Sequence, residues 1–247
     1  MRPINVPLQL LISSQQEHYV SRLRFFLLLK MLYPHGKTKL SWGELMAIKH
    51  VLRIKSEKTL RSYLQFFEQK GWIRLNTRTG YYIIKSFDKI RSENNWRSRY
   101  AMVLQPLDLL KLKAFVGAGI YAYLYKAFLR RLKKKKSVLI KGRTYHFLDF
   151  RLNRDLAVPV SVHGVSKIFN ISPALASRLK SAAARENLLE VQKNYSKRAV
   201  RKRTMQLCLK YNDHPQNIVY HNGASRLQLI DAVIPLFSFT RRKKMKT

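Results

Sequence analysis

Hydrophobic and polar positions follow a helical period over the first third of the chain. Residues 17–33 are apolar on one side and end at a Pro-His-Gly triplet, residues 34–36, which is a helix-stop signal. Ser41, with Glu44 three positions later, is typical of a capping box, so a second helix is predicted from there to about Val51. The chain therefore opens on two helices separated by a short turn.

A third helix is predicted to begin after Ser56, and it has the clearest division into two faces. Leu60, Leu64 and Phe67 recur at i, i+4 and i+7, so they share one buried side. The opposite side is polar and cationic, and such side chains can hydrogen-bond to base edges or phosphates. These candidate nucleic-acid contacts are Lys58, Arg61, Ser62, Gln65 and Gln69.

A β-hairpin is predicted directly after this helix, which a Gly-Trp pair ends. Two short apolar segments, residues 73–75 and 81–84, flank a polar turn at residues 76–80. The turn is basic because Arg78 lies in it, and Arg78 is a further candidate contact.

The middle of the chain combines a polar boundary with a long apolar helix. Residues 88–99 are polar and charged, which predicts a domain boundary, and a short strand is expected over residues 101–104. Pro106 then opens a long helical pattern, in which Gly117 and Gly119 indicate a break or a point of close packing. The apolar positions of this pattern are Leu109, Leu112, Phe115, Ile120, Leu124 and Phe128.

A run of cations ends this helix. Unpaired, these side chains repel one another, and a solvated loop is one interpretation. Few acidic residues lie nearby, so we expect a strap that contacts phosphates. Its candidate contacts are Arg130, Arg131, Lys133, Lys134, Lys135 and Lys136.

A second pair of helices is predicted beyond residues 137–150, which are expected to be strand or loop. Residues 160–169 form the short first helix of the pair. Asn170 tolerates the left-handed backbone that the following turn needs. Ser172 then caps the next helix, and Pro173 occupies its first turn, where a missing N–H costs nothing.

The helix after Ser172 is the strongest candidate for reading DNA. Leu175, Leu179 and Ala182 are predicted to form its buried stripe. Small residues beside arginines suit a helix that must approach base edges, and Arg is the residue best shaped for bidentate contact with guanine. Together with Ser172, its candidate contacts are Ala174, Ser177, Arg178, Ser181 and Arg185.

A further strand is expected over residues 188–195, with a return strand at residues 217–220 or in the segment around Asn222 and Gly223, a tight-turn signal. Between the two lies a second cationic run, followed by residues 205–211, which we interpret as an insertion. The candidate contacts in it are Lys197, Arg198, Arg201, Lys202 and Arg203.

Both helix pairs resemble known DNA-binding folds. The pattern Ser56-x-x-Thr59-Leu60, Gly71-Trp72-Ile73 and the hairpin are similar to the winged helix. Residues 170–178 resemble the helix-turn-helix pattern Gly-Val-Ser-x-x-Thr-Val-Ser-Arg of bacterial proteins, with Asn170 in place of the glycine and Leu175 where threonine is commoner. A helical domain whose hairpin packs on a protein, and a core helix with an ordinary solvent face, are the structural alternatives.

The predicted fold is α+β, mostly α, with two winged helix-turn-helix domains joined by a basic helical connector. The first domain covers residues 1–90, and a linker with the long helix covers residues 91–136. The second domain covers residues 137–240, and residues 241–247 are expected to be a basic flexible tail that adds affinity for DNA.

Charge decides which partners fit this fold. The chain has 49 Lys and Arg against 13 Asp and Glu, a formal net charge of +36. A compact state with this imbalance repels itself unless a polyanion relieves it, and nucleic acid ranks before an anionic membrane surface. The apolar runs at residues 25–29 and 114–125 are shorter than the roughly 20 residues that span a bilayer, so we expect buried helices there.

Catalytic and metal-binding patterns are not found in the sequence. The histidines have no metal-ligand spacing, the acidic residues are scattered, and no phosphate-cradling Gly-x-x-x-x-Gly-Lys run occurs. We therefore expect no enzyme activity, no metal, no cofactor and no small-molecule substrate. A single cysteine, Cys208, and the lack of a signal-peptide pattern favour a cytoplasmic location, on DNA, in a bacterium or a phage-infected cell.

Two winged helices in tandem resemble plasmid replication initiators and the regulators of phages and mobile elements. The resemblance implies sequence-specific binding to double-stranded DNA, in replication initiation or transcription regulation, and a homodimer if the first module pairs with a copy of itself. The main alternative is a non-specific structural nucleoprotein, packaged with a phage genome or bound to RNA. A membrane-surface protein would need a basic amphipathic helix with exposed aromatic residues instead.

Overall fold

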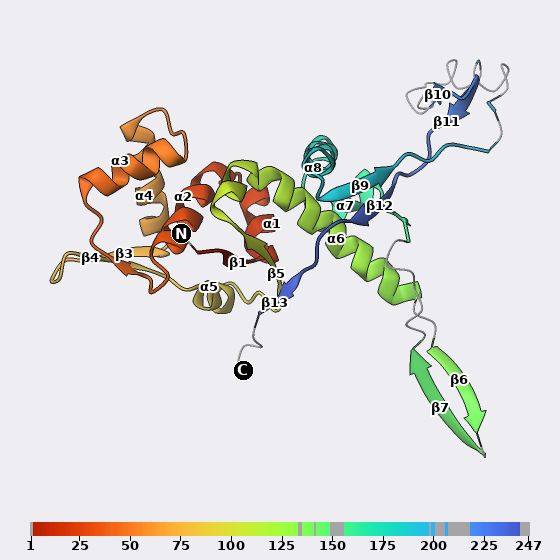
Figure 1. Cartoon of the computed structure of the whole chain (residues 1–247), viewed down its shortest axis with the longest axis horizontal. Helices are drawn as coiled ribbons and strands as arrows, with labels where there is room; N and C mark the ends of the chain where they lie inside the picture. Colours follow the sequence, from red (N-terminus) through yellow and green to blue (C-terminus); the bar gives the residue numbers. More distant parts are fainter. Residues whose placement is uncertain are drawn as a thin grey trace.

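A computed structural model of the chain describes residues 2–132, 135–140, 142–148, 156–197, 199–200, 206 and 218–242. The described residues form a mixed α+β structure, as predicted. Figure 1 shows an elongated molecule in which the long helix α6 (Leu112–Leu132) runs across the middle, with elements from the two halves of the chain on either side.

The N-terminal half combines helices with a small antiparallel sheet. Its elements are β1 (Ile4–Pro7), α1 (Leu8–Gln16), α2 (Val20–Leu32), β2 (Lys37–Thr38), α3 (Trp42–Val51), α4 (Glu57–Gln69), β3 (Ile73–Asn76), β4 (Tyr81–Ile84) and α5 (Phe87–Glu93). The predicted helix over residues 17–33 is α2. A separate α1 precedes it, and the two are divided at His18, whose φ of 57° is left-handed.

Helices α3 and α4 begin at the capping residues that the sequence predicts. The hydroxyl of Ser41 accepts the Glu44 N–H at 3.2 Å, and the Glu44 carboxylate accepts the Ser41 N–H at 2.8 Å, so the predicted capping box is confirmed. Ser56 caps α4 by accepting the N–H of Thr59 at 3.1 Å. These bonds satisfy N–H groups that would otherwise lack partners in the first turn.

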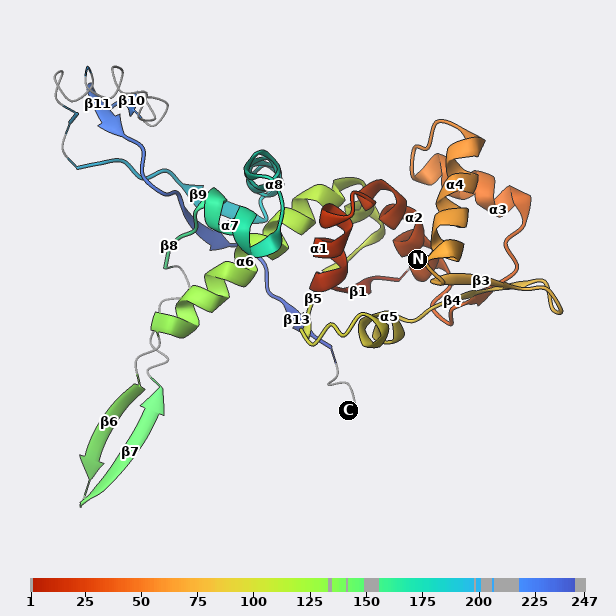
Figure 2. The ribbon, with the colours of Figure 1, turned by 180° about the vertical axis from the view of Figure 1, so that it is seen from behind.

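The C-terminal half begins after a short strand and a 3₁₀ turn. Its elements are β5 (Tyr100–Leu104), η1 (Pro106–Lys111), α6, β6 (Lys135–Ile140), β7 (Arg143–Leu148), β8 (Val158–Pro159), α7 (Val162–Phe169), α8 (Pro173–Arg185), β9 (Leu189–Gln192), β10 (Ile218–His221), β11 (Ala224–Leu227), β12 (Ala232–Pro235) and β13 (Thr240–Arg241). Figures 1 and 2 both show the β6–β7 and β10–β11 hairpins extending away from α6.

The two halves repeat one order of elements. Helix, strand, helix, helix, strand, strand is α2-β2-α3-α4-β3-β4 in the first half. In the second half it is α6-β8-α7-α8-β9-β12, with the β6–β7 hairpin inserted after α6 and the β10–β11 hairpin inserted after β9. Their sheets have the equivalent antiparallel orders β2-β4-β3 and β8-β12-β9. One backbone hydrogen bond also corresponds in the two halves. The N–H of Lys85, after β4, donates to Trp72 O at 2.8 Å, and the N–H of Leu236, after β12, donates to Leu188 O at 3.1 Å.

The return strand of the second repeat differs from the prediction. Strand β9 pairs with β12, whereas residues 218–221 pair with residues 224–227 in a hairpin of their own. Asn222 and Gly223 form its turn, with φ of 49° and 74°. Two adjacent residues with positive φ suit the twist of a two-residue hairpin. After this turn the chain runs back beside the residues that follow β9, where Ser196 N–H donates to Leu227 O and Leu229 N–H to Asn194 O, both at 2.8 Å, before it reaches β12.

A third sheet joins segments from three parts of the chain, in the order β1-β5-β13. Arg241 pairs with Tyr100 in it, and Arg242 donates from its backbone N–H to Arg99 O at 3.0 Å. The Arg242 guanidinium also binds the Asp88 carboxylate, at 2.9 and 3.0 Å. The prediction of a flexible tail from residue 241 is therefore wrong for its first two residues, and residues 243–247 lie outside the described part.

Buried side chains form one connected core from Val6 to Val233. The predicted boundaries near residues 90 and 136 do not divide this cluster, because α6 packs against α1 and also against α8. The apolar runs at residues 25–29 and 114–125 contribute to it. None of the helices in the described ranges has the combination of length and apolar content that a bilayer crossing requires.

The crossing of α6 and α8 depends on Gly117. A Cβ at this position would lie 2.2 Å from the carbonyl oxygen of Leu179, a backbone atom that cannot rotate away. Of the two predicted roles of Gly117, a break or a point of close packing, close packing is thus the correct one, because α6 continues through this residue. The hydroxyl of Tyr121 also donates to Ala176 O at 3.2 Å across the same interface.

Replacing Gly117 with Ala should lower the free energy of unfolding by about 1–3 kcal/mol, because the added methyl group overpacks a backbone contact. Gly43→Ala is the matched control, because nothing lies within 4 Å of a Cβ there. The control should leave stability unchanged or raise it by up to about 1 kcal/mol through helix propensity. Urea unfolding of both variants measures the difference, and equal stabilities would contradict the close crossing.

Candidate nucleic-acid interface

Helix α8 is positioned by the turn that precedes it. Asn170 adopts the left-handed conformation with φ of 48°, as predicted, and Ile171 is buried beneath the turn. The Ser172 hydroxyl accepts the N–H of Leu175 at 3.2 Å, and Pro173 is the first residue of the helix. The local sequence therefore determines where the helix begins and how the chain enters it.

The buried stripe of α8 differs from the prediction by one position. Ala176, Leu179 and Ala183 face the core, whereas Leu175 and Ala182 are only half-buried. At the close crossing with α6, the backbone of Leu179 lies against Gly117, and the small residues Ala176 and Ala183 share this buried side. The buried side of α8 is thus shifted by one position from the predicted stripe, and its polar side stays exposed.

The predicted reading face of α8 is exposed. Every candidate side chain on it is open to solvent: Ser172, Ala174, Ser177, Arg178, Ser181 and Arg185. The guanidinium of Arg178 donates to Ala174 O at 3.3 Å, a long bond within the helix that a better acceptor can replace. The face thus offers hydroxyls and guanidinium groups to an outside partner.

The corresponding face of α4 is exposed as well, over Lys58, Arg61, Ser62, Gln65 and Gln69. Leu60 and Phe67 are buried on the opposite side, as predicted, and Leu64 is half-buried. Arg61 stacks on the Trp42 ring at 4.6 Å, which holds its guanidinium over α3. Stacking uses the flat side of this group and leaves its N–H edge for hydrogen bonds.

The remaining predicted cations are spread over the molecule rather than gathered. Arg78 is exposed in the β3–β4 turn, Lys197 is exposed after β9, and Arg130 stacks on Tyr100 near the end of α6. Arg131 lies in the last turn of α6, and Lys135 and Lys136 lie in β6. Candidates outside the described residues are Lys133, Lys134, Arg198, Arg201, Lys202 and Arg203.

Several acidic side chains form ion pairs with cations other than the predicted nucleic-acid contacts. Within the described ranges, the ion pairs are Glu17–Lys70, Glu93–Lys85, Glu186–Lys111, Asp88 with Arg91 and Arg242, and Asp231 with Lys180 and Lys193. None of them includes a predicted nucleic-acid contact. The exposed face of α8, a helix without acidic residues, therefore keeps its positive charge, which favours an anionic partner. On α4 no ion pair neutralises Lys58 or Arg61, although Glu57 is exposed in the first turn.

Crowding of cations is visible around Lys126. Burial lowers the pKa of its ammonium group, and repulsion from Arg241 and Arg130 lowers it further. The same ammonium lies over the Phe239 ring, 4.7 Å from its centre. Positive charge at this end of α6 is thus offset by aromatic faces rather than by carboxylates.

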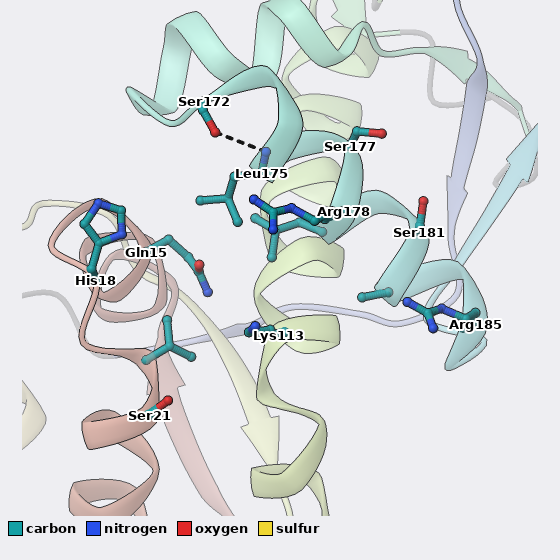
Figure 3. A pocket seen from close by; sticks show the side chains of 13 residues that line it. Gln15, His18, Ser21, Lys113, Ser172, Leu175, Ser177, Arg178, Ser181 and Arg185 are labelled. Carbon is teal, nitrogen blue, oxygen red and sulfur yellow. Dashed lines mark hydrogen bonds between the residues drawn. The ribbon is translucent and has the colours of Figure 1, made fainter.

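A pocket of about 580 Å³ lies beside α8. Figure 3 shows it between α8 on one side and the α1–α2 turn on the other, with Lys113 at the start of α6 below. Sequence reasoning missed its residues from outside α8, chiefly Gln15, His18 and Lys113. No local signal could have found them, because they come together only through the packing of three helices.

Comparison with protein-family models, curated proteins and solved structures gives no match to this chain. Within the described residues, no cluster of His, Cys, Asp and Glu has a geometry that could hold a metal ion. The interface must therefore be interpreted from its own residues.

The ion pair of Lys180 and Asp231 connects α8 to the segment before β12, and both side chains are largely buried. Burial alone would raise the pKa of Asp231, but the hydrogen bond and attraction from Lys180, with further attraction from Lys193, hold it below the ordinary value. A carboxyl group with a lowered pKa stabilises the fold above its unfolded-state pKa, and this contribution disappears as the pH falls through the lower folded-state pKa.

Asp231→Asn should lower the free energy of unfolding at pH 7 by about 3 kcal/mol, because it leaves the Lys180 ammonium buried without its partner. The deficit relative to the unmodified protein should shrink below about pH 4, where the wild-type carboxyl group also becomes protonated. Denaturant unfolding over a pH series measures it. Glu93→Gln, at an exposed pair, is the control and should cost at most about 1 kcal/mol; a similar loss in both variants would contradict the role of burial.

Proposed function

We propose that this protein is a sequence-specific binder of double-stranded DNA, built from two winged helices and acting in replication initiation or transcription regulation. The repeated order helix, strand, helix, helix, strand, strand supports two winged-helix units. In each unit the second helix of the turn, α4 or α8, has the position of a recognition helix, and the hairpin that follows has the position of a wing.

The exposed face of α8 is the observation on which this proposal depends. It places Arg178 among Ala174, Ser177 and Ser181, all of them open to solvent. Small neighbours let the helix approach the floor of a major groove, and the guanidinium can then donate to the O6 and N7 atoms of a guanine. The ion pairs described above leave this arginine free of carboxylates.

Binding then has two components, electrostatic attraction to phosphates and recognition of bases. The excess of cationic over acidic residues, a net charge of +36, attracts the phosphates without regard to sequence, which gives affinity and strong salt dependence. Base contacts from α8, and from the face of α4, supply the sequence preference. The β3–β4 hairpin and the paired strands β9 and β12 are expected to contact the neighbouring backbone.

The shared core contains residues of both reading helices. Gln16 of α1 donates to the carbonyl oxygen of Phe169 in α7 at 2.7 Å, and Lys111 pairs with Glu186 after α8. Together with the packing of α6, these contacts hold α4 and α8 in one orientation. A protein of this kind should recognise two DNA elements at one fixed separation.

Selection of bound sequences from random duplex DNA at near-physiological salt tests the proposal. Enrichment of a defined motif is expected, and an unselective pool would contradict sequence-specific binding. The unselective result would instead support a structural nucleoprotein that depends on charge alone.

Arg178→Ala should relax the preference at one base pair of the selected site, at a cost of about 1–3 kcal/mol against the correct sequence. Arg143→Ala removes the same charge from the exposed end of the β6–β7 hairpin and should leave base preference intact. Binding to a panel of single-base variants measures both. An even loss of affinity over all sequences would mean that Arg178 contacts only phosphate.

Inserting about five base pairs between the two halves of the selected site should reduce affinity at least tenfold, because half of a roughly 10.5-base-pair turn rotates one element to the opposite side of the duplex. Restoring a full turn should not recover the affinity, since a rigid body cannot extend its reach. Tolerance of both insertions in gel-shift titrations would contradict a fixed orientation of α4 and α8.

A further inference from the structure

The pocket beside α8 has the chemistry of an anion site. Its polar lining from outside α8 includes Gln15, His18, Ser21 and Lys113, and Arg178 and Arg185 line it from α8. No aspartate or glutamate is among the described residues that line it. The pocket therefore presents hydrogen-bond donors and positive charge from four helices, α1, α2, α6 and α8, without a carboxylate to neutralise them.

Gln15 provides an independent indication of a ligand. Its side chain is only 4% exposed, and its Nε2 atom has no hydrogen-bond partner in the structure. Figure 3 shows its amide extending into the gap toward Arg178 and Lys113. A buried amide N–H without an acceptor destabilises a protein, so its presence at the wall of a cationic pocket indicates an acceptor that comes from outside.

The pocket continues toward the other reading helix. Ser21 lines it and also lines a second pocket, at the turn before α4, together with Arg24, Arg53 and Lys55. Arg24 has a buried Nε atom that likewise lacks a partner. Two neighbouring pockets, one at the start of α4 and one beside the exposed face of α8, thus have cationic linings and share Ser21.

A phosphate group fits these features best. It offers several acceptor oxygens and a negative charge, which satisfy an amide and an ammonium group at once. Two neighbouring cationic pockets suit a chain of phosphates better than one isolated anion, and one of them lies beside the helix proposed to enter the major groove.

We propose that Gln15 and Lys113 hold a backbone phosphodiester of the duplex whose bases α8 reads. This assignment rests on the proposed function, and it adds a site that positions the strand next to Arg178. Gln15 donates through its amide and Lys113 through its ammonium group, so the first contributes a bond without charge and the second a charge. Free phosphate is the other source of the same chemistry.

Gln15→Leu and Lys113→Gln test the assignment, with Lys89→Gln as the matched control because Lys89 is exposed on α5, outside both pockets. Binding to the selected duplex, and to an arbitrary duplex of equal length, is measured over a salt series. Lys113→Gln should reduce the slope of log K against log salt by about 1 on either DNA, beyond any effect of Lys89→Gln.

Gln15→Leu should raise Kd about tenfold with the salt slope unchanged, since it removes a neutral donor to a charged acceptor. It should also raise the Tm of the free protein by about 2–4 °C, because it removes the unpartnered buried amide. A lost fold would lower Tm, so the two readouts separate loss of binding from loss of structure. Unchanged Kd in Gln15→Leu, or equal slopes in Lys113→Gln and Lys89→Gln, would overturn the assignment.

Methylphosphonate scanning of the duplex locates the contact. Neutralising one particular phosphate should weaken binding by the unmodified protein and should not weaken binding by Lys113→Gln any further. Neutralising any other contacted phosphate should weaken binding by both proteins equally. Millimolar inorganic phosphate that raises Tm in the unmodified protein but not in Gln15→Leu, without any such coupled position, would assign the pocket to free phosphate instead. Because the arbitrary duplex needs no preferred site, failure of sequence-specific binding remains distinguishable from failure of this pocket.

Discussion

The packing of α8 on α6 is the interaction on which the rest of the structure depends. At Gly117 the backbone of α8 lies so close that a methyl group would collide with Leu179 O. That contact turns Ala176, Leu179 and Ala183 inward and the polar side of α8 outward. Since α6 also packs on α1, the same helix places the first half of the chain beside α8 and creates the pocket that contains Gln15.

The placement of the few acidic residues explains how such a basic chain stays compact. Most of the ion pairs among the described residues connect segments far apart in sequence, such as Lys70 with Glu17, Arg242 with Asp88, and Lys180 with Asp231. Carboxylates placed at these junctions stabilise the fold where elements meet. None of these ion pairs uses a cation on the outward faces of α4 and α8, so attraction to a polyanion and folding depend on different cations.

Local chemistry made much of this fold predictable. Ser41, Ser56 and Ser172 cap the helices they were expected to cap, and Asn170 has the left-handed backbone that its turn requires. The exposed faces of α4 and α8 followed from periodicity alone. Each of these features depends on residues within a few positions of one another, which a sequence displays directly.

Long-range features could not be predicted in the same way. Helix α1 is buried from Leu8 to Gln15 on most of its surface and shows no two-faced pattern, so it left no signal. The partner of β9 lies some 40 residues away in sequence, beyond a hairpin that closes on itself at Asn222. Gln15 and Lys113 approach α8 only through tertiary packing, so the site predicted from the sequence did not include them.

Guanine N7 methylation interference on the bound duplex tests the central claim most directly, because N7 lies on the floor of the major groove. If α8 reads DNA there, methylation of one or two guanines should abolish binding, and the Arg178→Ala protein should lose its sensitivity at one of them. Binding that is indifferent to every N7 methyl group would contradict the account and leave only attraction between a cationic surface and phosphates.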